Sequence, residues 1–132
     1  MSTSDNKKVV ENLLSLSGDD PLSALSDDVR WTVIGTTVFS GTYNGKQEMI
    51  EKMFGPLMSQ LQAPGRIDVQ NLVAEGDIVV VQAQAKDRTT RDGHPYNNTY
   101  CFVLRLADGK VVEAYEYCDT ELITAAFGAR GG

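Results

Sequence analysis

Apolar residues in the first part of the chain recur at helical spacing. From residue 5 to about Gly18 they come every three or four positions, which predicts a helix capped by Ser4 or Asp5 and ended by Gly18. The next stretch, DDPLSALS at 19–26, predicts a short second helix with Pro21 in its first turn. The chain is therefore expected to begin with two helices.

A longer helical pattern runs from Lys46 to about Gln62. Its apolar residues form one stripe, made of Met49, Ile50, Met53, Phe54, Leu57, Met58 and Leu61. Proline cannot donate a backbone hydrogen bond within a helix. The pair Gly55-Pro56 inside the run therefore predicts a kink or a division of this helix.

After residue 66 the pattern changes to the alternation of β-strands. Five segments are strand candidates: 29–35 before the long helix, and then 67–74, 78–86, 96–106 and 111–117. The stretch FSGTYNG at 39–45 is interpreted as a connection, DRTTRD at 87–92 as a solvated hairpin end, and Asp119 as the cap of a last helix. Helices followed by a four-stranded antiparallel meander predict an α+β fold, with one curved sheet covered by helices on one face.

The last hairpin places an acid on an apolar face. Ala107-Asp108-Gly109 suits a three-residue loop, which pairs Tyr100 with Glu116 and Phe102 with Ala114. Opposed residues point to one side of a sheet. The face toward the helices then holds Asn98, Tyr100, Phe102, Leu104, Val112, Ala114, Glu116 and Cys118. A two-residue loop would instead turn the residues after the loop to the opposite face.

Composition narrows the class of protein. The 132 residues suit one domain, 1–132, and 42% are hydrophobic. The net charge of −6 without a basic cluster argues against nucleic acid and anionic membranes as partners. No apolar run approaches a membrane span and no secretory signal is visible, so a cytoplasmic location is expected. The single histidine, His94, makes a metal site improbable. In the predicted register Cys101 and Cys118 lie on opposite faces, which argues against a disulfide.

Three segments together resemble a known family. SDDVRWTVIG at 26–35, FSGTYNGKQEMIEKM at 39–53 and YNNTYCFVLRLADGKVVEAYEYCD at 96–119 resemble a SnoaL-like member of the nuclear transport factor 2-like superfamily. The resemblance implies a cone-shaped α+β barrel, whose strongly curved, mainly antiparallel sheet wraps around the N-terminal helices and a deep apolar pocket. It also implies a homodimer through the outer sheet face, supplied here by Cys101, Val103, Tyr115 and Tyr117.

Two enzymes of this superfamily do not match the chain. Relative to ketosteroid isomerase, the resemblance places the base near 32–33 and one acidic donor at Phe102, and neither position holds a carboxylate. Relative to limonene epoxide hydrolase, it places the first carboxylate near Ala85 and the arginine near Ala83, and both are missing. Only the second carboxylate has a counterpart, Glu116.

The leading hypothesis is therefore a pocket protein for a small apolar organic ligand, with cofactor-independent acid–base chemistry of the isomerase or polyketide cyclase kind. Glu116 would move the proton, and Tyr100 and Asn98 would orient it. The predicted pocket residues are Trp31, Tyr43, Phe102, Leu104 and Ala114.

The alternative is a non-catalytic ligand-binding or dimeric interaction protein of the same fold. In that case Tyr100 and Trp31 are core residues, Asn98 ties down a strand entry and Tyr43 anchors a loop. An enclosed pocket where Glu116, Tyr100 and Asn98 converge would favour the enzyme. A filled pocket, or a Glu116 without donors and open to solvent, would favour the alternative.

Overall fold

The computed structural model describes residues 2–15 and 20–131. In chain order, its elements are α1 (Thr3–Ser15), η1 (Pro21–Ala24), β1 (Leu25–Val33), β2 (Gly41–Asn44), α2 (Lys46–Met49), η2 (Ile50–Phe54), α3 (Gly55–Ser59), β3 (Leu61–Ala63), β4 (Arg66–Glu75), β5 (Ile78–Lys86), β6 (Thr89–Thr90), β7 (Thr99–Ala107), β8 (Lys110–Cys118) and α4 (Thr120–Phe127).

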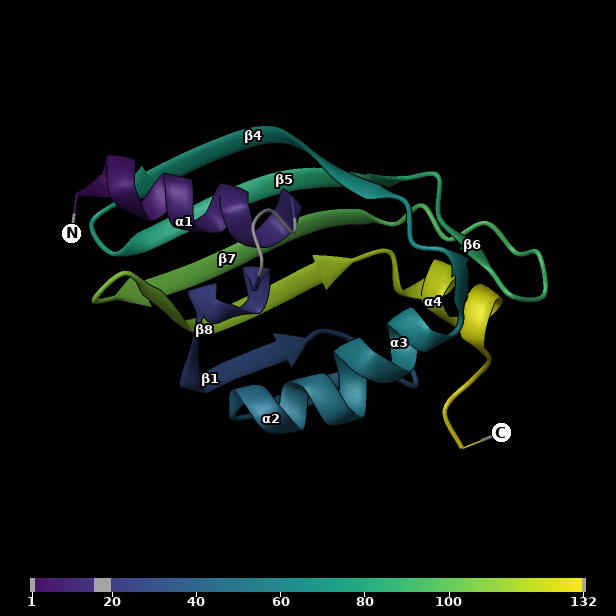
Figure 1. The fold of residues 1–132 in the computed structure, drawn as a ribbon. Helices are drawn as coiled ribbons and strands as arrows, with labels where there is room; N and C mark the ends of the chain where they lie inside the picture. Colours follow the sequence, from purple (N-terminus) through teal and green to yellow (C-terminus); the bar gives the residue numbers. More distant parts are fainter. Residues whose placement is uncertain (1, 16–19, 132) are drawn as a thin grey trace.

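The elements form an α+β fold around one large curved sheet (Figure 1). Its strand order is β2-β1-β8-β7-β5-β4. The four long strands in the second half of the sequence pair as the expected antiparallel meander, and β1 joins it parallel to β8. Strand β2 lies within 39–45, so the prediction of a plain connection there is wrong. A small second sheet pairs β3 with β6.

The helices cover the inner face of the sheet from two sides. Helix α1 lies over β4 and β5, while α2 runs beside β1 and α3 continues beyond the end of that strand (Figure 1). The backbone N–H of Asp5 donates to the Ser2 hydroxyl, so Ser2 takes the capping role that was predicted for Ser4 or Asp5. Gly18, the predicted end of this helix, lies outside the described residues. The second predicted helix is a single 3₁₀ turn, η1, with Pro21 at its start as expected.

The long helix is divided where Gly55-Pro56 predicted it. Pro56 has no N–H to donate, and the preceding turns widen into a π-helix, η2, in which the Gly55 N–H donates to the Ile50 carbonyl. A Cβ atom at residue 55 would lie 2.6 Å from that carbonyl oxygen, so only glycine fits this wide turn. The helical run ends at Ser59, earlier than predicted, because Leu61 already belongs to β3.

Away from the turn, the β7–β8 hairpin has the predicted faces but different partners. Its loop contains two residues, Asp108 and Gly109, both with positive φ, as a tight hairpin turn requires. A loop shorter by one residue would turn every residue of β8 to the opposite face of the sheet. A bulge next to Leu106 reverses this change beyond it. Phe102 therefore faces Glu116, where Tyr100 was predicted. The bulge also buries Val111 in place of Val112.

Two local predictions, the cap of α4 and the unpaired state of the two cysteines, are confirmed. The Asp119 side chain accepts a hydrogen bond from the Leu122 N–H and caps α4 as predicted. Cys101 and Cys118 are both free, as expected from their opposite faces. None of the helices within 2–15 and 20–131 is long and apolar enough to cross a membrane. Across the same ranges, no three His, Cys, Asp or Glu side chains gather in a way that could hold a metal ion.

Candidate functional site

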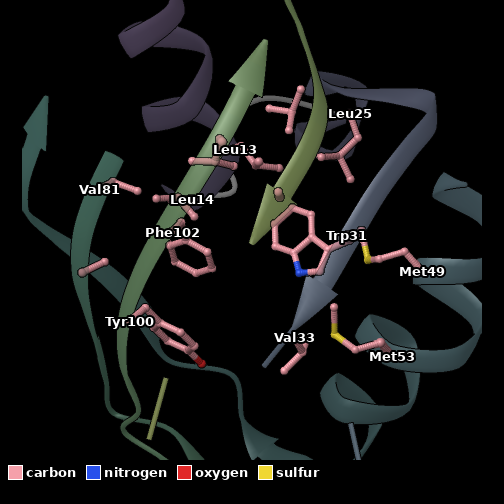
Figure 2. Packing of buried hydrophobic residues seen from close by; sticks show 14 of the residues in the cluster. Leu13, Leu14, Leu25, Trp31, Val33, Met49, Met53, Val81, Tyr100 and Phe102 are labelled. Carbon is pink, nitrogen blue, oxygen red and sulfur yellow. The ribbon is translucent and has the colours of Figure 1, made fainter. Parts of the chain in front are cut away.

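The inner face of the sheet and the helices line an apolar cavity of about 80 Å³ that is partly open to solvent. Its walls come from α1, β1, the 46–59 helical run, β7 and β8. Figure 2 shows Trp31, Phe102 and Tyr100 on the strands, with Met49 and Met53 reaching toward Trp31 from the helical run. Apart from Glu116, Tyr100 and Arg88, the side chains that line the cavity are apolar.

Glu116 lies on the inner face of β8 and is only 9% exposed. One of its oxygens, Oε1, accepts a hydrogen bond of 3.1 Å from the Trp31 indole nitrogen. The other oxygen has no hydrogen-bond partner among the described residues. Burial raises the pKa of Glu116 to about 7, against the opposing effects of the Trp31 hydrogen bond and the positive charge of Arg88. The carboxyl group is therefore poised to lose or take up a proton near neutral pH.

Tyr100 reaches the same cavity from β7. Its ring stacks on Phe102 with a centroid distance of 5.1 Å, and its hydroxyl accepts a hydrogen bond of 3.4 Å from Arg88 Nη1. Burial raises the pKa of Tyr100 well above its ordinary value, so the hydroxyl stays protonated and can donate to a neighbouring oxygen.

Arg88 is a site residue that the sequence analysis missed. It belongs to 87–92, which was interpreted as solvated, but it is only 6% exposed and lines the cavity. The strand alternation of β5 would point residue 87 inward. Asp87 has a φ of 58°, and this left-handed residue breaks the alternation so that Arg88 turns inside. Arg88 Nε then donates to the Pro64 carbonyl at 2.8 Å.

Asn98 is fully buried, but its hydrogen bonds belong to the scaffold. Its Nδ2 donates to the Tyr96 hydroxyl and to the Asp119 carbonyl, both at 3.2 Å. Its Oδ1 accepts from the backbone N–H groups of Thr99 at 2.8 Å and Asp119 at 2.9 Å. The side chain thus ties the start of β7 to the start of α4, and the structure does not bring it to the cavity.

The predicted pocket residues divide into two groups. Trp31 and Phe102 line the cavity. Leu104 and Ala114 face each other across β7 and β8 as fully buried core residues outside the lining. The Tyr43 hydroxyl donates to the Phe39 carbonyl at 2.7 Å and anchors the β1–β2 connection. This is the loop-anchoring role that was the alternative to a place in the pocket.

Comparison with solved structures finds the same fold over nearly the whole chain. An NTF2-like protein from Burkholderia pseudomallei has 23% identity and a TM-score of 0.78, covering 98% of this chain and 100% of its own. The protein TerC, co-crystallised with polyporic acid, has 21% identity and a TM-score of 0.75 over 92% of this chain and 97% of its own. A protein of ketosteroid isomerase-like fold from Catenulispora acidiphila, in complex with trimethylamine, has 12% identity and a TM-score of 0.73 over 92% of this chain and 93% of its own.

The family comparison agrees with the fold. No curated protein matches the chain. The model of the SnoaL-like domain matches residues 17–114, which is most of the chain. The predicted resemblance is confirmed: the chain has the fold of NTF2-like proteins, and it belongs to the SnoaL-like family.

Proposed function

We propose that this protein binds a small, mainly apolar molecule in the central cavity and moves a proton on it with Glu116. The observation that carries the proposal is a buried carboxyl group that lines an apolar cavity and has one oxygen without a partner among the described residues. Two proteins of the same fold were crystallised with small molecules, polyporic acid and trimethylamine, which supports ligand binding.

The chemistry that fits is proton transfer next to a carbonyl group. The Glu116 carboxylate would remove a proton from the carbon beside the carbonyl, and the Tyr100 hydroxyl would donate to the oxygen that gains negative charge. In a β,γ-unsaturated ketone, returning the proton at the γ-carbon moves the double bond and gives an isomerisation. Attack of the enolate on a second carbonyl forms a C–C bond and an alkoxide, which takes the proton back from Glu116 and completes a cyclisation. A pKa near the working pH suits a group that must both take and return a proton. These steps need no cofactor.

The size of the cavity limits the ligand. An apolar cavity of roughly 150 Å³ holds a benzene molecule, and the cavity here is about 80 Å³. Met49, Met53 and Met58 form part of its wall. Methionine side chains are flexible and adapt to irregular contents, so we expect the wall on the helical run to widen around a ligand.

A hydrogen–deuterium exchange experiment tests the proposed function. Cyclopentanone in D₂O near pD 7 would be incubated with the wild-type protein and with Glu116→Gln, and deuterium at the carbons beside the carbonyl would be followed by proton NMR. We expect the wild type to accelerate exchange and the variant to lose about 10²- to 10⁴-fold of that acceleration. Equal rates in both proteins would contradict a proton-transfer role for Glu116.

The same experiment addresses the non-catalytic alternative. That alternative is favoured by the absence of matching groups at Ala83, Ala85 and Phe102, and by the scaffold role of Asn98. Shifts of the Trp31 indole NMR signal on adding cyclopentanone, without deuterium exchange, would indicate a binding protein.

We also propose that the protein is a homodimer through the outer face of the sheet. Tyr117 is 43% exposed there, and Cys101, Val103 and Tyr115 are partly exposed on the same face. Interfaces are enriched in such aromatic anchors. We expect Tyr117→Glu to shift the protein toward monomer in light scattering coupled to size exclusion. The control Val38→Glu replaces an apolar residue of similar exposure, 38%, outside that strand face and should leave the mass unchanged. A monomeric wild type would contradict the proposal.

A further inference from the structure

We propose that Arg88 anchors a negatively charged oxygen group of the ligand, so that the cavity selects small apolar monocarboxylic acids. This inference rests on the proposed function, because it requires that the central cavity is the ligand site. It goes beyond that function by naming the class of ligand and the residue that selects it.

Arg88 carries a charge that its neighbours do not balance. A guanidinium group is always ionised, and burying it is costly unless it is paired. Arg88 is 6% exposed, yet its side-chain partners among the described residues are two neutral oxygens, the Pro64 carbonyl and the Tyr100 hydroxyl. In the described part of the chain, Arg88 and Glu116 form no direct ion pair. The charge influences Glu116 from a distance, and the guanidinium retains the capacity to pair with an anion.

The geometry of the guanidinium also suits an anion. Pro64 holds Nε, and Nη1 points to Tyr100. The third nitrogen, Nη2, has no hydrogen-bond partner among the described residues. It is also not one of the fully buried side-chain atoms without a partner, so it keeps some accessible surface. Arg88 lines the cavity beside Tyr100, so the guanidinium and a rotatable hydroxyl are neighbouring donors. A planar carboxylate suits such a pair of donors, whereas the apolar body of the ligand would contact the methionine wall.

The charges that surround the cavity favour a single anionic group. Glu116 from β8 and Tyr100 from β7 are the other ionisable groups in the lining. Tyr96 and Cys118 lie behind them, and burial raises the pKa of each to about 12, so both stay neutral near pH 7. Other nearby charges, such as Asp119 next to Cys118, lie outside the lining. Protonated Glu116 therefore leaves the single positive charge of Arg88 in the cavity, and ionised Glu116 cancels it.

This arrangement couples ligand binding to proton uptake. A carboxylate should bind best when Glu116 is protonated. Each binding event should therefore keep Glu116 protonated to higher pH and leave it as the proton donor, rather than the base, toward that ligand. The affinity should then fall by about tenfold between pH 6 and pH 8, as Glu116 ionises with its pKa of about 7. A neutral ligand of the same shape should lack this fall.

The test compares acids with their neutral amides by NMR titration of the Trp31 indole signal. The probes are 3-methylbutanoate and benzoate, each against its amide, at pH 6 and pH 8. At pH 6 we expect the acids to bind the wild type about ten- to a hundredfold more tightly than the amides, the range for hydrogen bonds to charged groups. Arg88→Met should remove this preference while affinity for the amides stays within about twofold, and Arg88→Lys should keep part of it.

A second variant keeps the test valid if Arg88→Met does not fold. Glu116→Gln leaves Arg88 intact and removes the titrating group, so acids should bind it equally well at pH 6 and pH 8. Amides that bind as tightly as the acids would overturn the role of Arg88 but leave the cavity as a ligand site. An acid affinity that depends on pH in the same way in Glu116→Gln would overturn the coupling between the bound acid and Glu116. If neither acids nor amides shift the Trp31 signal, the cavity is not the site, and the proposed function fails together with this inference.

Discussion

Replacing Glu116 with glutamine is expected to stabilise the protein at alkaline pH. Burial raises the pKa of this carboxyl from its ordinary 4.5 to about 7, so the folded state holds a proton that the unfolded state has already released. The stability from this group is fully present below pH 4.5 and is lost as the pH rises to about 7. A shift of this size corresponds to roughly 3 kcal/mol. The side chain of glutamine cannot ionise, so the variant avoids that loss.

The measurement is the free energy of unfolding from urea titrations of both proteins at pH 5 and pH 8. The variant's advantage should grow by about 2 to 3 kcal/mol between these values. The control Glu75→Gln removes an exposed carboxylate at the end of β4 and should change the difference by less than about 0.5 kcal/mol. An advantage that stays constant with pH would mean that Glu116 is not a desolvated acid. Destabilising groups of this kind are typical of functional sites, where activity and stability conflict.

Replacing Gly65 with Ala is expected to damage the fold at the point that positions Arg88. Gly65 has a φ of 59°, and a Cβ atom there would lie 2.0 Å from the Lys86 carbonyl oxygen and 2.8 Å from the Asp87 carbonyl. The close approach of these two backbones brings the Pro64 carbonyl to the Arg88 guanidinium. Because backbone atoms cannot move aside cheaply, we expect a loss of at least about 3 kcal/mol from strain and overpacking together.

Gly76 provides a matched control for this substitution. It has the same φ of 59°, but a Cβ atom there would meet nothing within 4 Å. Gly76→Ala should therefore cost only the backbone strain, about 1 to 2 kcal/mol. Urea or thermal unfolding measures the loss of unfolding free energy in both variants. The difference between the two losses is the cost of the close contact between residue 65 and residues 86–87. Equal losses in the two variants would show that the 65–87 contact is not tight and does not hold Arg88 in place.

The sequence could predict the fold and the face of the acid because both depend on local periodicity. Alternating residues in 96–118 identify the inner side of the hairpin, and Glu116 is buried there as expected. The partner of each residue was wrong because a bulge and a shorter loop have opposite effects on parity, and neither leaves a mark in the pattern. The prediction was thus correct for the faces from Tyr100 to Leu104 and from Ala114 to Cys118, wrong for Val112, and wrong for the pairs.

Arg88 could not be found in this way because its position depends on contacts distant in the sequence. A charged residue in a polar stretch such as 87–92 is normally solvated. Its burial requires the positive φ of Asp87 and the Pro64 carbonyl, which lies 24 residues earlier in the chain. Asn98 shows the opposite case, since a polar residue on the inner face was assigned to the site although the strand ends use its hydrogen bonds.

If Glu116 is a desolvated acid on a ligand cavity, the titration of its own carboxyl group must show it. Carbon-13 NMR of the side-chain carboxyl groups would be followed from pH 3 to pH 9, with Glu116→Gln identifying the signal. We expect an inflection near pH 7, well above the ordinary value of 4.5. An inflection close to 4.5 would show a solvated, structural carboxylate and would contradict both the proton-transfer role and its coupling to Arg88.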